Sequence, residues 1–294
     1  MIQDGLVVVW KEAGWTSFDV VAKLRRILGT RKAGHTGTLD PQAEGVLPAA
    51  FGKGTKAVSL MENWDKTYRA VLRLGVITDT QDMTGSILEK REYRQITREL
   101  FEEKVLSFEG EQMQIPPMYS ALKVRGKKLY ELAREGIEIP RQPRPVVFHS
   151  LRICSFEPPF AEIEAVCSKG TYIRTLCHDI GTALGCGAAM ERLVRTRVGP
   201  FEAEEAHRIS ELESAKESGR LDDCIISLEE LFSQYPAYRC KTGQDRYLLN
   251  GNRIACSAPP VSGLVRMYTS GGAFAGLYRW DTEKGEYRPE KMFI

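Results

Sequence analysis

Apolar positions along the chain follow patterns that predict both strands and helices. Residues 6–10 and 46–51 form short apolar runs, which are typical of buried strands. Residues 146–156 and 160–167 also have a strand-like composition. Alternation of apolar and polar positions predicts a further, half-buried strand, whose inward side chains are Tyr68, Ala70, Leu72 and Leu74.

Helical spacing begins at Thr16, where Thr16 and Asp19 have the arrangement of a capping box and Gly29 supplies a stop. The apolar face of this predicted helix comprises Val20, Val21, Leu24, Ile27 and Leu28. On composition alone, Leu193 is interpreted as a core residue of another helix. Further helices are predicted at residues 56–63, 97–106, 172–184, 210–219 and 228–235.

Two segments interrupt these patterns. Residues 123–145 contain seven basic residues, two glycines and three prolines around a short helical piece at 127–134, so we expect an exposed insertion. Beyond Pro236, short apolar runs at 264–267 and 274–280 are separated by glycines, which indicates a small β-rich module. A chain of 294 residues is longer than one core usually organises, so we expect two domains, 1–235 and 236–294.

The composition favours a globular protein outside the membrane. Apolar residues make up 43% of the chain and charged residues 27%. The longest aliphatic and aromatic run is residues 6–10, far below the ~20 residues that a membrane helix needs. Residues 1–4 do not have the basic and apolar regions of a secretory signal, so we expect a cytoplasmic protein.

Cysteine spacing gives no metal signature. The chain has seven cysteines, and no two of them are spaced as Cys-x-x-Cys. We therefore expect reduced, mostly buried thiols and no bound metal.

Charge is distributed unevenly along the chain. The net charge of +2 combines +5 over residues 1–200, −7 over 201–236 and +4 over 237–294. Several basic clusters lie in the first and last of these parts, which makes a polyanionic partner, most simply a nucleic acid, a reasonable hypothesis.

Four segments carry more glycine, proline or polar residues than a core element needs. Residues 34–41 surround Asp40 with glycines and threonines and end at Pro41, which suggests a rigid loop that presents one acid, although an Asx-type turn is the alternative. Residues 65–69 and 116–123 are the second and third segments. In residues 168–175, Gly170 permits a turn and Thr171 is expected to cap the following helix.

Read together, these segments closely resemble the bacterial tRNA pseudouridine synthases of the TruB type. The matching blocks follow the order expected for that family from residue 1 to about 235, and the part after Pro236 resembles its RNA-binding PUA-like module only loosely, through residues 248–254. The blocks are residues 34–48, 65–68, 78–82, 116–123, 168–175 and 192–201.

The resemblance implies an α+β fold with a mixed, mainly antiparallel central sheet flanked by helices and a small β-rich C-terminal domain. It also implies an isomerase that detaches uracil from ribose and reattaches it through carbon. Asp40 matches the family's essential aspartate, and the sequence leaves open whether it attacks the ribose carbon or the ring. No electrons are transferred, so no cofactor is required.

The resemblance also assigns three residues around Asp40. Arg174 matches an arginine that pairs with the acid, whereas from sequence alone a surface or helix-capping role is the favoured interpretation. Tyr68 matches an active-site tyrosine that can stack on uracil, against the alternative of a core tyrosine. Leu193 matches an apolar residue of the pocket.

Three further residues match substrate-binding positions. His35 matches a position that contacts the RNA while the target nucleotide is held out of the stack. The alternative is a histidine that forms hydrogen bonds only within its own loop. Lys56 matches a position near the pocket, and Asp82 matches an acid of its polar network. The insertion at 123–145 matches a segment that closes over RNA.

The resemblance implies a tRNA partner, recognised at the T-stem-loop and modified at uridine 55, without a guide RNA and with the protein acting as a monomer. A non-catalytic RNA-binding or tRNA-folding protein and a guide-dependent relative remain alternatives. A magnesium phosphohydrolase that uses Asp79 and Asp82 as ligands is a third alternative.

Overall fold

The computed structural model describes residues 4–124, 126–256 and 262–294. Its strands are β1 (Gly5–Lys11), β2 (Ala33–His35), β3 (Glu44–Phe51), β4 (Lys66–Leu74), β5 (Val76–Thr78), β6 (Ile87–Lys90), β7 (Gly110–Gln114), β8 (Lys123–Val124), β9 (Lys127–Lys128), β10 (Arg144–Glu157), β11 (Phe160–Cys167), β12 (Ala188–Val198), β13 (Phe201–Glu202), β14 (Ala237–Arg239), β15 (Ile254–Ala255), β16 (Leu264–Tyr268), β17 (Phe274–Asp281) and β18 (Glu286–Met292).

The α-helices are α1 (Ser17–Ile27), α2 (Val58–Met61), α3 (Arg98–Leu106), α4 (Leu129–Arg134), α5 (Ile173–Ala183), α6 (Ile209–Glu217), α7 (Leu228–Leu231) and α8 (Asp245–Leu249). Short 3₁₀ turns are η1 (Gly52–Ala57), η2 (Ala203–Glu205), η3 (Leu221–Cys224) and η4 (Thr242–Gln244). No helix of the described ranges is long and apolar enough to cross a membrane.

A mixed nine-stranded sheet forms the body of the molecule. Its main path runs β1-β3-β12-β4-β11-β10-β7, with β2 paired to β3 and β13 paired to β12. Among the described strands of this sheet, only β3 and β12 pair in parallel, through Val194 with Glu44 and Arg195 with Gly45. This architecture confirms the predicted α+β class with a mainly antiparallel sheet.

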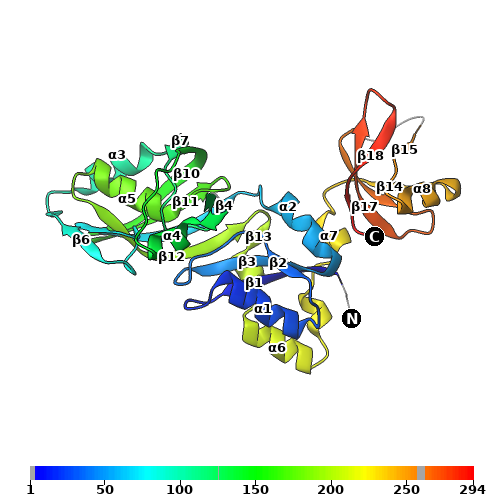
Figure 1. Ribbon diagram of the computed structural model, residues 1–294, viewed down its shortest axis with the longest axis horizontal. Coiled ribbons are helices and arrows are strands. Elements are labelled where there is room, and N and C mark those ends of the chain that lie inside the picture. Colours follow the sequence, from blue (N-terminus) through cyan, green and yellow to red (C-terminus); the bar gives the residue numbers. More distant parts are fainter. Residues whose placement is uncertain (1–3, 125, 257–261) are drawn as a thin grey trace.

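Helices cover both faces of this sheet, as Figure 1 shows at β1 and β3, where α2 and α7 lie on one side and α1 and α6 on the other. The alternation of side chains explains the layers. Val7, Val9 and Leu47 pack in one cluster with α1 and α6, whereas Leu6 and Val8 point to the opposite face.

The start of α1 follows the predicted capping box. Thr16 accepts from the backbone N–H of Asp19, and the Asp19 carboxylate accepts from the backbone N–H of Thr16. Gly29 follows the helix with φ +64°, as its predicted role as a stop requires.

Other predictions need correction. Residues 56–63 form η1 and the four-residue α2, and the helix predicted at 228–235 ends at Leu231. Leu193 lies on strand β12 and not in a helix. Thr171 does not cap α5, because its hydroxyl donates to the Ser168 carbonyl at 2.8 Å and Tyr172 is the N-cap residue.

The basic insertion is shorter than predicted. β10 begins at Arg144, and Pro145 already pairs with Met113 of β7. Within the insertion, β8 and β9 form a hairpin that leads into α4. Arg125, one of its seven basic residues, lies outside the described residues.

The strands of a second sheet, ordered β14-β16-β17-β18-β15, begin at Ala237 and end at Met292. This sheet is the β-rich C-terminal part predicted from the sequence, and it lies at the right of Figure 1. It shares a core with the body: the Phe293 ring stacks on Phe232 at 5.6 Å between centroids and packs against Phe274. Arg266 also donates to the carbonyl of Tyr235 at 2.8 Å.

The parallel junction of β3 and β12 requires glycine. Gly45 has φ +118°, and a Cβ atom there would lie 2.1 Å from the carbonyl oxygen of Arg195. A side chain would therefore be strained and would also force the two strands apart.

We predict that Gly45→Ala lowers the free energy of unfolding by about 3 kcal/mol or more, because overlap adds to backbone strain. Gly219→Ala is the matched control, since Gly219 has φ +72° with open space around it, and it should cost only about 1 kcal/mol. Urea denaturation measures both. Equal losses would show that the junction tolerates a side chain.

Candidate active site

The Asp40 loop, defined here as residues 36–43, connects β2 to β3. The predicted loop starts two residues earlier, but Gly34 and His35 pair with β3. The hydroxyl of Ser17 accepts from the N–H of Leu39 at 2.9 Å and donates to the carbonyl of Leu39 at 3.2 Å. The loop is therefore fixed to the first turn of α1 immediately before Asp40.

Two buried cations that the sequence analysis did not single out also hold this loop. Lys11 is 0% exposed, and its ammonium donates to the carbonyls of Pro41 and Ala43 at 3.0 and 2.6 Å. Arg195 is 1% exposed and donates to the carbonyls of Val46 and Gly37 at 2.7 and 3.2 Å.

Burial lowers the pKa of Lys11 to about 8, against the attraction of Asp40. The sequence offered one indication that Lys11 is buried, because this lysine ends a strand that is otherwise apolar. Nothing in the sequence separates Arg195 from its basic neighbours.

Arg174 of α5 contacts Asp40 through two parallel interactions. Its Nε lies 2.9 Å from Oδ2, and its Nη2 donates to Oδ1 at 3.1 Å. The side chain of Arg174 is 6% exposed, whereas that of Asp40 is 35% exposed. The arginine is thus embedded in the protein and the carboxylate keeps an accessible face, as a group that reacts with a substrate requires.

The remaining donors of Arg174 fix its position. Nη2 donates to the carbonyl of Tyr119 at 2.8 Å, and Nη1 lies 3.4 Å from the carbonyl of Thr80 and 3.5 Å from Oδ2 of Asp82. Tyr119 belongs to the predicted segment 116–123, and Asp82 to 78–82. Four separate sequence blocks therefore meet at one guanidinium.

Asp82 is held within its own turn. Its Oδ1 accepts from the hydroxyls of Thr80 and Thr84 and from the N–H of Thr84. Asp79 accepts from the N–H of Ser86 at 2.8 Å. Among the residues that the structure describes, no group of three His, Cys, Asp or Glu side chains could hold a metal ion. The bonds of these two acids favour a structural role over the magnesium site considered above.

Burial raises the pKa of the Asp40 carboxyl, and the negative charge of Asp82 raises it further. Arg174 and Lys11 act in the opposite direction. The carboxylate is therefore less stabilised than a solvated aspartate, which makes it more basic while the arginine still favours its ionised form.

Tyr68 and Leu193 lie on adjacent strands beside the Asp40 loop. Tyr68 of β4 is opposite Arg195 of β12, and Leu193 is opposite Ala70, so all four side chains lie on the same face of the sheet. Tyr68 and Leu193 belong to one apolar cluster with Leu39 and Ala43 of the Asp40 loop. Burial raises the pKa of Tyr68, which keeps its hydroxyl protonated.

Two of the expected substrate-binding positions, His35 and Lys56, are placed differently. His35 accepts from the N–H of Gly37 at 3.3 Å, and burial with nearby Arg195 lowers the pKa of its imidazole. The exposed Lys56 donates to the carbonyl of Ile294 at 3.3 Å. Within the described parts of the chain, no hydrogen bond or ion pair joins Lys56 to Asp40 or Arg174, so its expected place beside the pocket has no support from the geometry.

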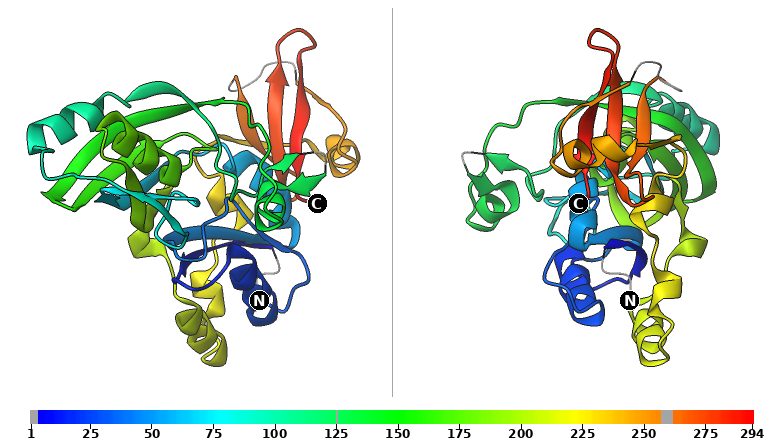
Figure 2. Two further views of the ribbon diagram at one scale, coloured as in Figure 1. Left: turned by 60° about the vertical axis from the view of Figure 1, so that its left-hand side comes forward. Right: turned by 90° about the vertical axis from the view of Figure 1, so that its right-hand side faces the viewer.

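The insertion is attached next to this cluster. The carbonyl of Tyr119, which Arg174 binds, precedes Ser120, whose carbonyl accepts from the N–H of Tyr130 in α4. The right-hand view of Figure 2 shows the α4 segment and α1 projecting on the same side of the molecule.

Sequence comparisons give a consistent assignment. Residues 25–173 match the N-terminal domain of the TruB family pseudouridylate synthases, and residues 174–233 match the tRNA pseudouridylate synthase B C-terminal domain. The tRNA pseudouridine synthase B of Lachnoclostridium phytofermentans is 45% identical, covering 99% of this chain and 100% of the relative. That of Clostridium perfringens is 42% identical, covering 99% of each chain.

Solved structures agree on the fold. A chain of a Cbf5-Nop10-Gar1 complex has a TM-score of 0.74 at 27% identity, covering 99% of this chain and 85% of that one. A chain of the archaeal box H/ACA sRNP Nop10-Cbf5 complex has a TM-score of 0.73 at 25% identity, with coverages of 100% and 87%.

The fold and both family matches are those of an isomerase that rearranges uridine within RNA. The chain belongs to the TruB family of pseudouridylate synthases, and its enzymatic activity is tRNA pseudouridylation.

The raised pKa of Asp40 predicts the acid side of the pH profile. Activity that needs ionised Asp40 should fall on acidification with an apparent pKa above the ordinary value of 3.8. Asp82→Asn removes a like charge, so it should move this limb to lower pH. Single-turnover rates across pH measure the shift.

Glu44→Gln is the control, because Glu44 pairs with Arg192 at the exposed edge of the site at 3.0 Å. Its acid limb should coincide with that of the unchanged protein. If the acid side of the pH–rate profile does not shift for Asp82→Asn, the electrostatic coupling of Asp40 and Asp82 is contradicted.

Proposed function

We propose that the enzyme converts uridine 55 in the T-loop of tRNA into pseudouridine, with Asp40 as the nucleophile acting on a flipped-out nucleotide. The observation that carries this proposal is the two-point pairing of a partly accessible carboxylate, Asp40, with the buried guanidinium of Arg174. The relatives named for tRNA support the substrate class. A loop target is physically suitable, because its bases can leave the stack at low cost.

The reaction leaves the elemental composition of the nucleoside unchanged. The bond between N1 of uracil and C1′ of ribose breaks, the base turns, and C5 bonds to C1′ while the C5 proton leaves and N1 gains one. Asp40 forms a covalent bond, to the ribose carbon or to the ring, that allows this separation, and this bond breaks again before the product leaves, which restores the carboxylate. Arg174 keeps the carboxylate ionised and fixes its direction.

The neighbouring side chains complete the pocket in this proposal. Tyr68 stacks on the uracil, and its protonated hydroxyl is available for proton movement at the ring. Leu193 forms an apolar wall beside it. Asp82 supports Arg174 without contacting the base, since its oxygens are bound to Thr80, Thr84 and Arg174.

The RNA must present its uridine in an extruded conformation, which costs a few kcal/mol. We propose that His35, next to the Asp40 loop, and the basic insertion at 123–145 bind the RNA in this state. Contacts of the insertion with phosphates would make binding weaken steeply with salt.

We also propose that residues 1–235 form the catalytic domain and 236–294 a PUA-like RNA-binding domain, and that the protein works as a cytoplasmic monomer without a guide RNA. The neighbours in solved structures belong to H/ACA assemblies. The insertion and the relatives named for tRNA favour a stand-alone enzyme here. A transcript modified by the purified protein alone would establish this independence.

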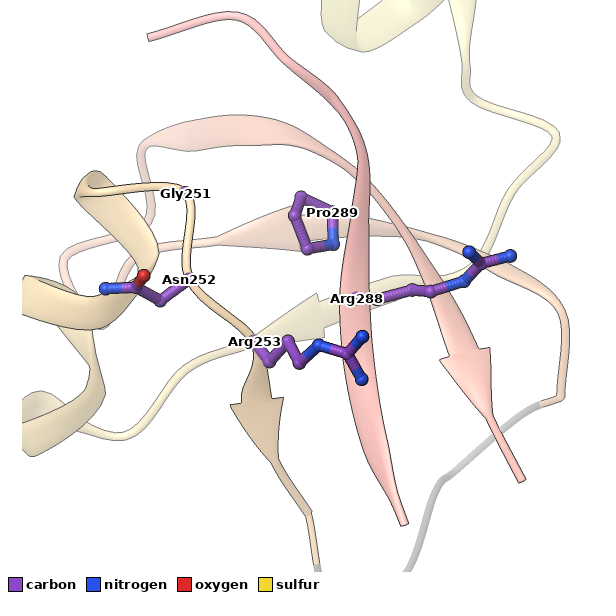
Figure 3. Close-up of a pocket in the computed structure, with 5 residues that line it drawn as sticks. All are labelled: Gly251, Asn252, Arg253, Arg288 and Pro289. Atoms are coloured by element: carbon purple, nitrogen blue, oxygen red, sulfur yellow. The ribbon is translucent and has the colours of Figure 1, made fainter. Parts of the chain in front are cut away.

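An open surface hollow of about 590 Å³ between residues 251–253 and strand β18 supports the proposal that the C-terminal part binds RNA. Figure 3 shows Arg253 and Arg288 among its lining residues. Arg253 pairs with Glu286 at 2.6 Å and with Asp281, whereas Arg288 is exposed on β18. An exposed guanidinium beside a surface hollow is suited to a phosphate.

We predict that Asp40→Asn abolishes turnover and leaves tRNA affinity within about tenfold, since the charge acts on chemistry more than on docking. Tritium release from C5-labelled uridine in an unmodified tRNA transcript measures turnover, and filter binding measures affinity. Asp79→Asn is the matched control and should retain activity.

A transcript with cytidine at position 55 tests the target nucleotide. It should release no tritium with the unchanged protein. Release from this transcript would refute the assigned position, and release by Asp40→Asn would refute the assigned nucleophile.

For the C-terminal part, we predict that Arg288→Ala weakens tRNA binding several-fold and reduces the slope of log affinity against log salt by about one, because one phosphate contact is lost. Arg279→Ala on the neighbouring strand is the control, since Arg279 is engaged by Glu290 at 3.0 Å. Equal salt slopes for the two variants would contradict a phosphate contact at Arg288.

A further inference from the structure

Phe18 is an exposed aromatic residue that the proposed chemistry does not use. It is the second residue of α1 and is 66% exposed, among the highest values for large apolar residues of the described chain. Single exposed apolar residues are common on protein surfaces. The position of Phe18 relative to the Asp40 loop is what sets it apart.

Helix α1 contacts both ends of the segment that leads to Asp40. Ser17, directly before Phe18, bonds to the backbone of Leu39. Two turns further along the helix, Arg25 donates to the carbonyl of Ala33 in β2 at 3.1 Å. Phe18 and Arg25 are seven residues apart and therefore share the helix face that borders this segment.

The two side chains also contact each other. The guanidinium carbon of Arg25 lies 5.9 Å from the centroid of the Phe18 ring. The pair combines a flat apolar ring with a planar cation, and Arg26, Arg31 and Lys32 add positive charge nearby in the chain. Aromatic rings and guanidinium planes are the groups on which unpaired bases of RNA stack.

We infer that Phe18 and Arg25 form a stacking platform for an unpaired nucleotide of the RNA that flanks the target uridine. Extruding the target leaves a neighbouring base without its stacking partner, and the platform lies beside the loop that carries Asp40. The inference rests on the proposed function, because it needs a flipped-out nucleotide at Asp40. It adds a binding contact that is separate from the chemistry.

The first test compares substitutions at Phe18 in the full-length enzyme. Phe18→Ala should raise KM for the tRNA transcript about tenfold with kcat nearly unchanged, since the ring binds RNA away from the reacting atoms. Phe18→Tyr should retain the unchanged KM, and Phe18→Leu should behave like Phe18→Ala, because leucine is apolar but has no flat face. Thermal unfolding of each variant confirms that the fold is intact.

Phe160→Ala is the matched control. Phe160 is 41% exposed, and the guanidinium carbon of Arg73 lies 5.8 Å from its ring centroid, yet it is the first residue of β11 and not part of α1 or the Asp40 loop. Its KM should not change. An unchanged KM for Phe18→Ala, an equal loss for Phe160→Ala, or full rescue by leucine would each overturn the platform. An unchanged KM for Phe18→Ala would mean that the Phe18 ring does not contribute to binding the tRNA.

The second test changes the RNA. Synthetic T-arm stem-loops carry one abasic nucleotide on either side of the target. One abasic position should weaken binding to the unchanged protein about tenfold and have little further effect on Phe18→Ala, because both changes remove the same contact. Additive losses at both positions would refute stacking.

Failure of this inference can be distinguished from failure of the proposed function. If the unchanged enzyme releases no tritium from uridine 55, the proposed function is wrong. If it does so, and Phe18→Ala binds tRNA equally well, only the platform is wrong.

Discussion

The ion pair between Asp40 and Arg174 is the interaction on which the rest of the site depends. Arg174 is buried, and a buried guanidinium needs most of its donors satisfied. It obtains them from Asp40, Asp82 and two backbone carbonyls, which belong to segments far apart in the chain. The same bonds that satisfy the arginine therefore assemble the site and aim the carboxylate outward.

The loop that carries Asp40 is fixed by groups with no contact to a substrate in the proposed reaction. Lys11 and Arg195 donate to its carbonyls from beneath, and Ser17 holds Leu39 from the side. Burying the two cations Lys11 and Arg195 is costly, so their bonds to carbonyls have to be well made. A rigid acid loses little entropy when the RNA arrives, which favours catalysis over mere binding.

Much of this structure could be predicted from the sequence where the signal is local. The cap at Thr16, the strand with Tyr68 and the turn at Gly170 all depend on near neighbours and were predicted correctly. Strand β12 was not recognised, because its charged residues hide the apolar alternation and its pairing with β3 and β4 is long-range. The family resemblance identified Arg174. It did not identify Arg195 and Lys11, whose role depends on carbonyl partners that are distant in the sequence.

The aromatic contacts of Phe293 have a consequence for how the chain is divided. Phe293 and Leu277 of the C-terminal part belong to the same apolar cluster as Leu6 and Val46 of the large sheet. The two sheets on either side of Pro236 therefore share a core and are expected to unfold cooperatively. Cutting the chain there would expose an apolar surface on the body. In the intact protein, the two sheets should melt in a single transition.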